Sequence, residues 1–203
     1  MNGAEVGRSY DARAAEYIAL VGEIEQTDAA DRSLIVSWRD ATPGRLLDAG
    51  CGPGLWTQFL HDGGRDVLGI DASEQFIAHA REQHPHLEFV HGSFADLPLD
   101  DAALGGILAW YSLIHTPPEE LPAYLAEFAR VLAPGGSILL GFFEGEPREP
   151  FAHAITTAYF WTADELAPML AEAGFTVTST ERRARTPGEV SARPHASVTA
   201  VRV

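Results

Sequence analysis

Three glycines alternate with other residues behind an acidic side chain in the segment Leu46-Leu-Asp-Ala-Gly-Cys-Gly-Pro-Gly54. Gly50, Gly52 and Gly54 allow close approach of a ligand to the backbone and conformations with positive φ. The first amides of a helix that follows such a loop attract an anionic group. Asp48 stands before the glycines, where a carboxylate would repel a pyrophosphate and attract the amino group of an amino acid. The spacing also differs from the dinucleotide fingerprint G-x-G-x-x-G, so it favours an amino-acid-containing ligand over a plain strand–helix turn.

A second acidic residue, Asp71, follows the next apolar segment, about 20 residues beyond the glycine loop. An acid at this distance is suited to hydrogen bonding with ribose hydroxyls. Taken alone, Asp71 could equally be a favourable charge at the start of a helix that Ser73 caps. The glycine loop nearby favours the ribose role. Cys51 lies inside that loop with no histidine indicated as its partner, so we do not interpret it as a nucleophile.

Apolar segments alternate with amphipathic ones along the chain. The strands and helices that this alternation predicts must position the glycine loop and Asp71. Apolar strands are expected at 45–49, 66–70, 87–90, 104–110 and 137–143, and helices at 55–61, 73–83, 117–132 and 162–173. Two helices are expected within 8–39, a loop at 144–150, and two antiparallel strands at 175–180 and 197–203. We therefore predict an α/β fold: a doubly wound, Rossmann-like, seven-stranded and mostly parallel sheet with a C-terminal antiparallel hairpin. A binding crevice is expected at the carboxyl ends of its strands.

The combination of these motifs resembles the class I S-adenosylmethionine (SAM)-dependent methyltransferases, especially the group that acts on small molecules. The resemblance covers about residues 40–180 and extends to His91-Gly-Ser-Phe-Ala-Asp-Leu-Pro98, Ala133-Pro-Gly-Gly136 and Ala173-Gly-Phe175. It implies that SAM is the cofactor and S-adenosylhomocysteine (SAH) its product. Metal ligands are not part of the predicted site.

The resemblance also assigns residues to parts of SAM. Asp48, Gly50, Gly52 and Gly54 match the motif that holds the methionine part, and Asp71 matches the acid on the ribose. Ser93 and Phe94 match the pair that flanks the adenine, although members of the family commonly have Asp where this chain has Ser93. We add Trp56 and Ala72, which follow the glycine loop and Asp71, to the predicted cofactor site.

The segment Ala109-Trp-Tyr-Ser-Leu-Ile-His115 lies, by the same resemblance, beside the donor methyl group. Trp110 and Tyr111 would pack against the sulfonium, and a cation–π contact of this kind is worth about 0.5–2 kcal/mol. His115 is a candidate base for the proton of the acceptor, with Tyr111 as a second candidate catalytic residue. In the alternative interpretation Trp110 belongs to the core and His115 caps the following turn. Alignment of the reactants alone would then suffice for transfer.

The predicted domain organisation is a single domain, 1–203, with an N-terminal helical lid at 1–39 and a SAM-binding core at 40–203. Tyr10 and Tyr17 are seven residues apart, which would place them on one helical face over the crevice, and Tyr17 is included in the predicted cofactor site. The N-terminal segment also resembles the family's first helix, which often closes over SAM. The aromatic residues of 142–161 either line a substrate pocket or form the underside of a loop. His153, which lies in the same segment, is a weaker second candidate base.

Composition narrows the classes of function. The net charge is −15, and the 14 basic residues are all arginine, so nucleic acid is an unfavourable partner despite a local patch at Arg182, Arg183 and Arg185. The absence of lysine excludes Schiff-base chemistry, and one cysteine cannot form an internal disulfide. We expect a cytoplasmic protein, bacterial in its use of arginine and alanine, monomeric or homodimeric, with no membrane partner.

The sequence therefore predicts methyl transfer to an unidentified small-molecule acceptor, whether at O, N, S or C. A non-catalytic SAM-binding regulator is the alternative, because it would keep the same pocket. An NAD(P)-dependent reductase is disfavoured by the glycine spacing and Asp48. A methyltransferase of nucleic-acid amino groups is disfavoured because the Asn/Asp-Pro-Pro-aromatic motif is missing after the strand at 104–110.

Overall fold

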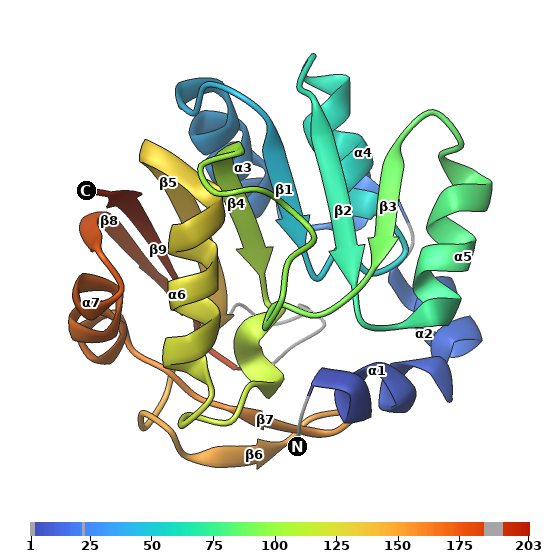
Figure 1. The fold of residues 1–203 in the computed structure, drawn as a ribbon. Coiled ribbons are helices and arrows are strands. Elements are labelled where there is room, and N and C mark those ends of the chain that lie inside the picture. The colour runs from blue at the N-terminus through green and yellow to red at the C-terminus, as the bar shows by residue number, and fades with distance from the viewer. Residues whose placement is uncertain (1–2, 22, 185–192) are drawn as a thin grey trace.

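The computed structural model describes residues 3–21, 23–184 and 193–203, and they form a seven-stranded sheet with helices on both faces (Figure 1). The strand order is β3-β2-β1-β4-β5-β9-β8. The strands are β1 (Leu46–Ala49), β2 (Val67–Asp71), β3 (Glu88–His91), β4 (Leu104–Trp110), β5 (Leu132–Phe143), β8 (Phe175–Arg183) and β9 (His195–Arg202). Strand β9 runs antiparallel to both β5 and β8, and the remaining pairs are parallel. The predicted fold class is confirmed.

Helices cover the sheet because its central strands are apolar on both faces. The helices are α1 (Gly3–Asp11), α2 (Ala14–Val21), α3 (Ala29–Ala41), α4 (Leu55–Asp62), α5 (Glu74–Gln83), α6 (Leu121–Val131) and α7 (Ala163–Glu172). Short 3₁₀ turns occur at η1 (Ile24–Gln26) and η2 (Leu113–His115). In Figure 1, α6 lies in front of the sheet and α3 behind it, while α1 runs below the carboxyl ends of the strands. The strand order reverses between β1 and β4, which is the position where α/β sheets bind ligands.

The N-terminal region contains three helices and a 3₁₀ turn, so the prediction of two helices within 8–39 was wrong. Helix α1 ends at Asp11, whose Oδ1 accepts hydrogen bonds from Ser73 Oγ at 2.6 Å and from the Gln75 amide at 3.1 Å. A separate helix, α3, begins after Asp28, whose carboxylate caps it by accepting from the Ala30 amide at 2.7 Å. Asp28 therefore marks the start of α3, whereas Asp11 joins the end of α1 to the first turn of α5.

Helix α3 belongs to the layers of the sheet rather than to a cover over the crevice. Its Ile35 and Trp38 are buried in one cluster with Leu46 of β1 and Leu139 of β5. Trp38 Nε1 also donates to Ser137 Oγ at 3.0 Å. The part of the predicted lid that lies over the carboxyl ends of the strands is therefore α1 and α2.

Residues 145–148 form bends and turns, as expected of the loop at 144–150, and a second, two-stranded sheet that was not predicted follows it, from β6 (Pro150–Ala152) and β7 (Thr157–Tyr159). Each strand has three residues, too few to show an alternation of apolar and polar side chains. Strands β8 and β9 are also longer than predicted, because they pair as far as Arg183 and His195. Figure 1 shows β6 and β7 at the same end of the molecule as α1.

The arginines of the predicted basic patch are neutralised by neighbouring acids. Arg182 pairs with Glu144 at 2.7 Å, and Arg183 pairs with Asp28 at 3.2 Å and with Asp31. Arg185 lies outside the described residues. Within the same described ranges, no helix has the length and apolarity required to cross a membrane.

Candidate functional site

A pocket enclosing about 820 Å³, part of it open to solvent, lies at the carboxyl ends of β1, β2 and β4 under α1 and α2. Its size is in the range of small-molecule sites. The predicted site residues that line it are Tyr17, Gly50, Gly52, Asp71, Ala72, Ser93, Phe94, Trp110, Tyr111 and His115. Chain segments that are far apart in the sequence therefore converge on one cavity.

Three predicted cofactor residues, Asp48, Gly54 and Trp56, lie behind the wall of this pocket. Asp48 is 1% exposed, and Thr57 Oγ1 donates to its Oδ2 at 2.6 Å. Burial raises the pKa of Asp48 to about 7. Gly54 caps α4 at φ +96°, with Ala80 and Phe89 packed close to it, while the Trp56 ring contacts other aromatic rings. In this arrangement the three residues support the wall of the pocket.

The glycine loop forms the floor of the pocket through its backbone. Gly50 has φ +80°, and a Cβ placed on it would lie 2.2 Å from Cβ of Ser112. The amides of Gly50 and Cys51 donate to the carbonyl of Ile70 at 2.8 and 3.0 Å. A residue with a side chain at position 50 would have to displace the segment after β4.

Asp71 connects the glycine loop to the helix that follows β2. Its Oδ2 accepts from the Gly52 amide at 2.9 Å, and its Oδ1 accepts from the Ser73 amide at 2.8 Å. Burial raises the pKa of this carboxyl group, whereas the two amides oppose that change. The carboxylate therefore lies at the wall of the pocket with its orientation fixed, as a ribose-binding acid requires. That role stays a prediction.

His115 has both ring nitrogens engaged and is 4% exposed. Nδ1 is 2.8 Å from the carbonyl oxygen of Thr157, and Nε2 is 2.9 Å from the hydroxyl of Tyr10. Because a carbonyl can only accept, Nδ1 carries the proton and Nε2 accepts from Tyr10. Burial lowers the pKa of His115, so the neutral form is favoured.

Tyr111 lines the pocket in a backbone conformation that is uncommon outside glycine, with φ +57°. Its ring lies 5.4 Å from that of Trp110 and 5.0 Å from that of Phe143, measured between centroids. Its hydroxyl contacts Nδ1 of His195. Surrounding packing holds a conformation of this kind, which is found most often at functional sites.

Tyr10 and Tyr17 both line the pocket, although they lie on two helices and not on one face of a single helix as predicted. Their rings meet edge to face at 5.6 Å. Gly7 brings α1 against the end of β2, since a Cβ on Gly7 would lie 2.1 Å from the carbonyl oxygen of Ala72. The close backbone approach fixes where α1 crosses the pocket.

Several pocket residues were not predicted from the sequence. Ser112, Phe76 and Tyr124 are among them. Within the described part of the chain, Oγ of Ser112 is buried without a hydrogen-bond partner, beside Gly50. A buried hydroxyl of this kind is suited to a polar ligand group. Its position directly after Tyr111 is the signal that could have identified it.

The aromatic residues of 142–161 and His153 are not among the described residues that line the pocket. None of Phe143, Phe151 and Phe160 lines the pocket; they pack with the main core beneath the segment, in accordance with the second interpretation. His153 contacts the ring of His115 at 5.0 Å between centroids, and burial lowers its pKa to about 4, which makes it a poor base. Cys51 is buried, and burial raises the pKa of its thiol, so it remains protonated.

Comparison with known proteins identifies a family model and relatives that this chain resembles. A family model described as a methyltransferase domain matches residues 46–136. A probable S-adenosylmethionine-dependent methyltransferase of Mycolicibacterium smegmatis is 34% identical over 143 residues, covering 66% of this chain and 53% of that protein. An uncharacterised methyltransferase of Geobacillus is 30% identical, covering 68% of this chain and 73% of that protein. The chain thus spans about half the length of the Mycolicibacterium relative.

Among solved structures, a Burkholderia thailandensis 1,6-didemethyltoxoflavin-N1-methyltransferase, bound to 1,6-didemethyltoxoflavin and S-adenosylhomocysteine, superposes with a TM-score of 0.76. It is 24% identical, and the match covers 100% of this chain and 91% of that one. At this identity the similarity supports the fold.

Proposed function

Because the chain belongs to the class I SAM-dependent methyltransferase family, we propose that it transfers the methyl group of SAM to a small-molecule acceptor and releases SAH. The observation that carries this proposal is the pocket itself, where the glycine loop, Asp71 and the segment after β4 meet under α1 and α2. SAM supplies an electrophilic methyl group on a positively charged sulfur. The remaining task of the protein is to bind, align and exclude water.

The residues present fit SAM at the cofactor end of the pocket. Gly50 lets the floor approach the segment after β4 without a side chain between them, and the orphaned hydroxyl of Ser112 lies beside it. We assign the methionine part to this floor and the ribose to Asp71. Ser93 and Phe94 line the same cavity, which supports their assignment to the adenine. Asp48 and Gly54 hold the loop in place from behind.

The acceptor is assigned to the end of the pocket formed by Tyr10, Trp110, Tyr111 and His115. Trp110 and Tyr111 present aromatic surface that is compatible with a sulfonium. Transfer proceeds mainly by proximity and alignment. His115 is the candidate proton acceptor, since its Nδ1–H is held by a backbone carbonyl and its Nε2 lone pair faces the tyrosine of α1.

A non-catalytic SAM-binding regulator is the alternative function. It would need the same cofactor end, but not a histidine with a defined tautomer beside the acceptor. Nucleic acid is not proposed as the acceptor, given the net charge of −15 and the paired arginines of β8.

Two measurements test the proposal. Titration calorimetry is expected to detect binding of SAM and SAH and none of NADH; binding of NADH without SAM would refute the cofactor assignment. A screen of SAM consumption over a metabolite library, with product masses recorded, is expected to yield an acceptor heavier by one methyl group. SAM binding with no methylated product across a broad library would favour the regulator.

A further inference from the structure

The hydrogen bond between Tyr10 and His115 connects α1 to the wall of the pocket across 105 positions of sequence. His115 is held on its other side by the carbonyl of Thr157 in β7. Three segments that are remote in the sequence therefore meet at one imidazole. Tyr10 and His115 both line the pocket, whereas Thr157 lies behind the ring.

The direction of these bonds determines what each group can do. His115 donates through Nδ1, so its Nε2 lone pair accepts the phenolic proton of Tyr10. With α1 in place, Nε2 is already occupied, and an acceptor in the pocket meets the oxygen of Tyr10 instead. That oxygen has lone pairs that do not take part in the bond to His115. A proton arriving at Tyr10 can thus be matched by one leaving toward Nε2.

We propose that Tyr10 is the catalytic residue that takes the proton of a hydroxyl acceptor, while its own phenolic proton passes to Nε2 of His115. The inference rests on the proposed function and names its acceptor class as a hydroxyl group. A bond forms between the acceptor oxygen and the methyl carbon, and the carbon–sulfur bond breaks with its electron pair going to sulfur. The acceptor O–H bond breaks and its proton goes to the oxygen of Tyr10. The phenolic proton of Tyr10 passes to Nε2 of His115, which becomes an imidazolium and loses this proton to water once α1 has moved away.

The charge of the enclosed site stays constant through this step. The sulfonium loses its positive charge as the imidazolium gains one, so no net charge is added to a buried pocket. The ionisable groups around the pair are Tyr17, Asp71 and His153. His153 does not compete for the proton, because burial and the neighbouring His115 lower its pKa to about 4. A hydroxyl acceptor gains most from such a pair, since its unassisted ionisation is unfavourable at neutral pH.

Tyr111 and His195 form a second tyrosine–histidine contact at the same pocket and are the competing pair. The Tyr10 pair is favoured because both Tyr10 and His115 are among the described residues that line the pocket, whereas of the competing pair only Tyr111 is. Tyr10 also lies on α1, so proton acceptance is coupled to the covering of the pocket. Tyr111, in contrast, is wedged between Trp110 and Phe143 on the sheet.

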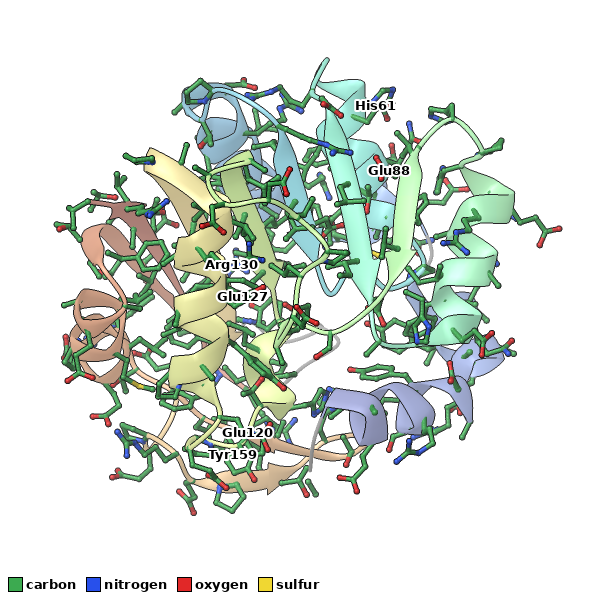
Figure 2. All side chains as sticks on the ribbon, in the orientation of Figure 1. His61, Glu88, Glu120, Glu127, Arg130 and Tyr159 are labelled. Atoms are coloured by element: carbon green, nitrogen blue, oxygen red, sulfur yellow. The ribbon has the colours of Figure 1, made fainter. Side chains whose placement is uncertain are left out.

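The first experiment compares Tyr10→Phe with Tyr159→Phe. Tyr159 of β7 does not line the pocket and is labelled in Figure 2 at the same end of the molecule, beside Glu120. The probes are 4-methylphenol, which is protonated at mildly alkaline pH, and 4-nitrophenol, which is mostly ionised there. We expect Tyr10→Phe to slow transfer to 4-methylphenol by about 10²-fold and to 4-nitrophenol by less than about threefold. Tyr159→Phe is expected to change neither.

An equal effect of Tyr10→Phe on both phenols would overturn the proton-transfer role, because an aligning residue affects both alike. A larger selective effect of Tyr111→Phe would transfer the role to the competing pair. If the wild-type protein binds SAM and methylates no phenol, the hydroxyl assignment is wrong. Failure of calorimetry to detect SAM or SAH would instead refute the proposed function itself.

The second experiment needs no acceptor. Nitrogen-15 NMR of His115 in the SAH complex is expected to show the Nδ1–H tautomer in the wild-type protein. Tyr10→Phe removes the donor to Nε2 and is expected to raise the pKa of His115, because the neutral ring loses a hydrogen bond that favours it. An unchanged titration and unchanged Nε2 shift would overturn the pairing.

Discussion

The two ends of the pocket are built in different ways. The cofactor end comes mainly from the stretch between Gly50 and Ser73, joined by Ser93 and Phe94 after β3, and its contacts are made largely by backbone amides and by Asp71. The acceptor end is assembled from α1, the residues at the end of β4 and η2, with Thr157 of β7 behind His115, and each of its contacts involves a side chain. One end is therefore fixed by the turn geometry of neighbouring strands, and the other by tertiary packing.

This difference implies a difference in local stability. The glycine loop is tied to β2 through the carbonyl of Ile70 and the carboxylate of Asp71. Helix α1 is held by the hydrogen bond of Tyr10 to His115, by the close approach of Gly7 to Ala72 and by the hydrogen bond of Asp11 with Ser73. The turn that follows α1 contributes a hydrogen bond from Arg13 to the carbonyl of Ala154. A short helix held by a few contacts opens at lower free energy than the interior of a sheet. The acceptor end is expected to open and close while the cofactor end stays formed.

The largest expected effect is at the acceptor end. His115→Ala should lower kcat by about 10²–10⁴ with little change in SAM affinity, because it removes the proton acceptor and leaves the glycine loop intact. Steady-state kinetics with the acceptor found by the screen, together with calorimetry, measure both quantities. A loss below about tenfold would leave alignment as the main mechanism, and loss of the folded state would assign His115 a structural role.

The next effect belongs to the cofactor end. Asp71→Asn should weaken SAM binding by about 1–3 kcal/mol, since it removes the charge of a carboxylate that accepts hydrogen bonds from two backbone amides at the pocket wall. The matched control is Asp100→Asn at an exposed position, which should bind SAM normally. Calorimetry measures the affinity of both variants for SAM. Equal SAM affinity in Asp71→Asn and Asp100→Asn would remove Asp71 from the cofactor site.

A smaller effect is expected from undocking α1. In Gly7→Val the new Cβ would lie 2.1 Å from the carbonyl oxygen of Ala72, so α1 must move away from the pocket. If the covered state falls to about a tenth of molecules, SAH should bind about tenfold more weakly. Ala4→Val, on the exposed side of the same helix, controls for helix propensity. Unchanged SAH release in Gly7→Val, measured by stopped flow, would show that α1 does not retain the ligand.

The smallest effect concerns the support beneath the cofactor end. Thr57→Val removes the donor to Asp48 and should destabilise the protein by about 1 kcal/mol in chemical unfolding. The pKa of Asp48 is raised in the folded state to about 7, so the folded state binds more protons than the unfolded one between about pH 4 and 7. The free energy of unfolding should therefore fall as pH rises through that window, and Asp48→Asn should remove this slope. A slope unchanged in Asp48→Asn would contradict the burial of this carboxyl group.

The sequence by itself determined the parts of the molecule that depend on local backbone chemistry. The alternation of apolar strands and helices predicted the sheet, since strands buried on both faces must be apolar throughout. The spacing of Gly50 and Gly52 and the position of Asp71 predicted a binding crevice at the ends of β1 and β2, where the structure has a pocket, because turns between adjacent elements are set by residues close in sequence. The helix expected at 162–173 is found as α7, whose first turn is capped by Thr162 Oγ1 accepting from the Glu165 amide.

Only the tertiary structure decided which side chains share the acceptor end. The pairing of Tyr10 with His115, the carbonyl of Thr157 behind it and the contact of Gly7 with Ala72 join positions with no periodic relation in the chain. The hydrogen bond between Asp11 and Ser73 likewise joins α1 to a residue 62 positions away in the sequence. Side-chain contacts between remote segments depend on how the layers pack, and one sequence read along its length contains no local signal for them.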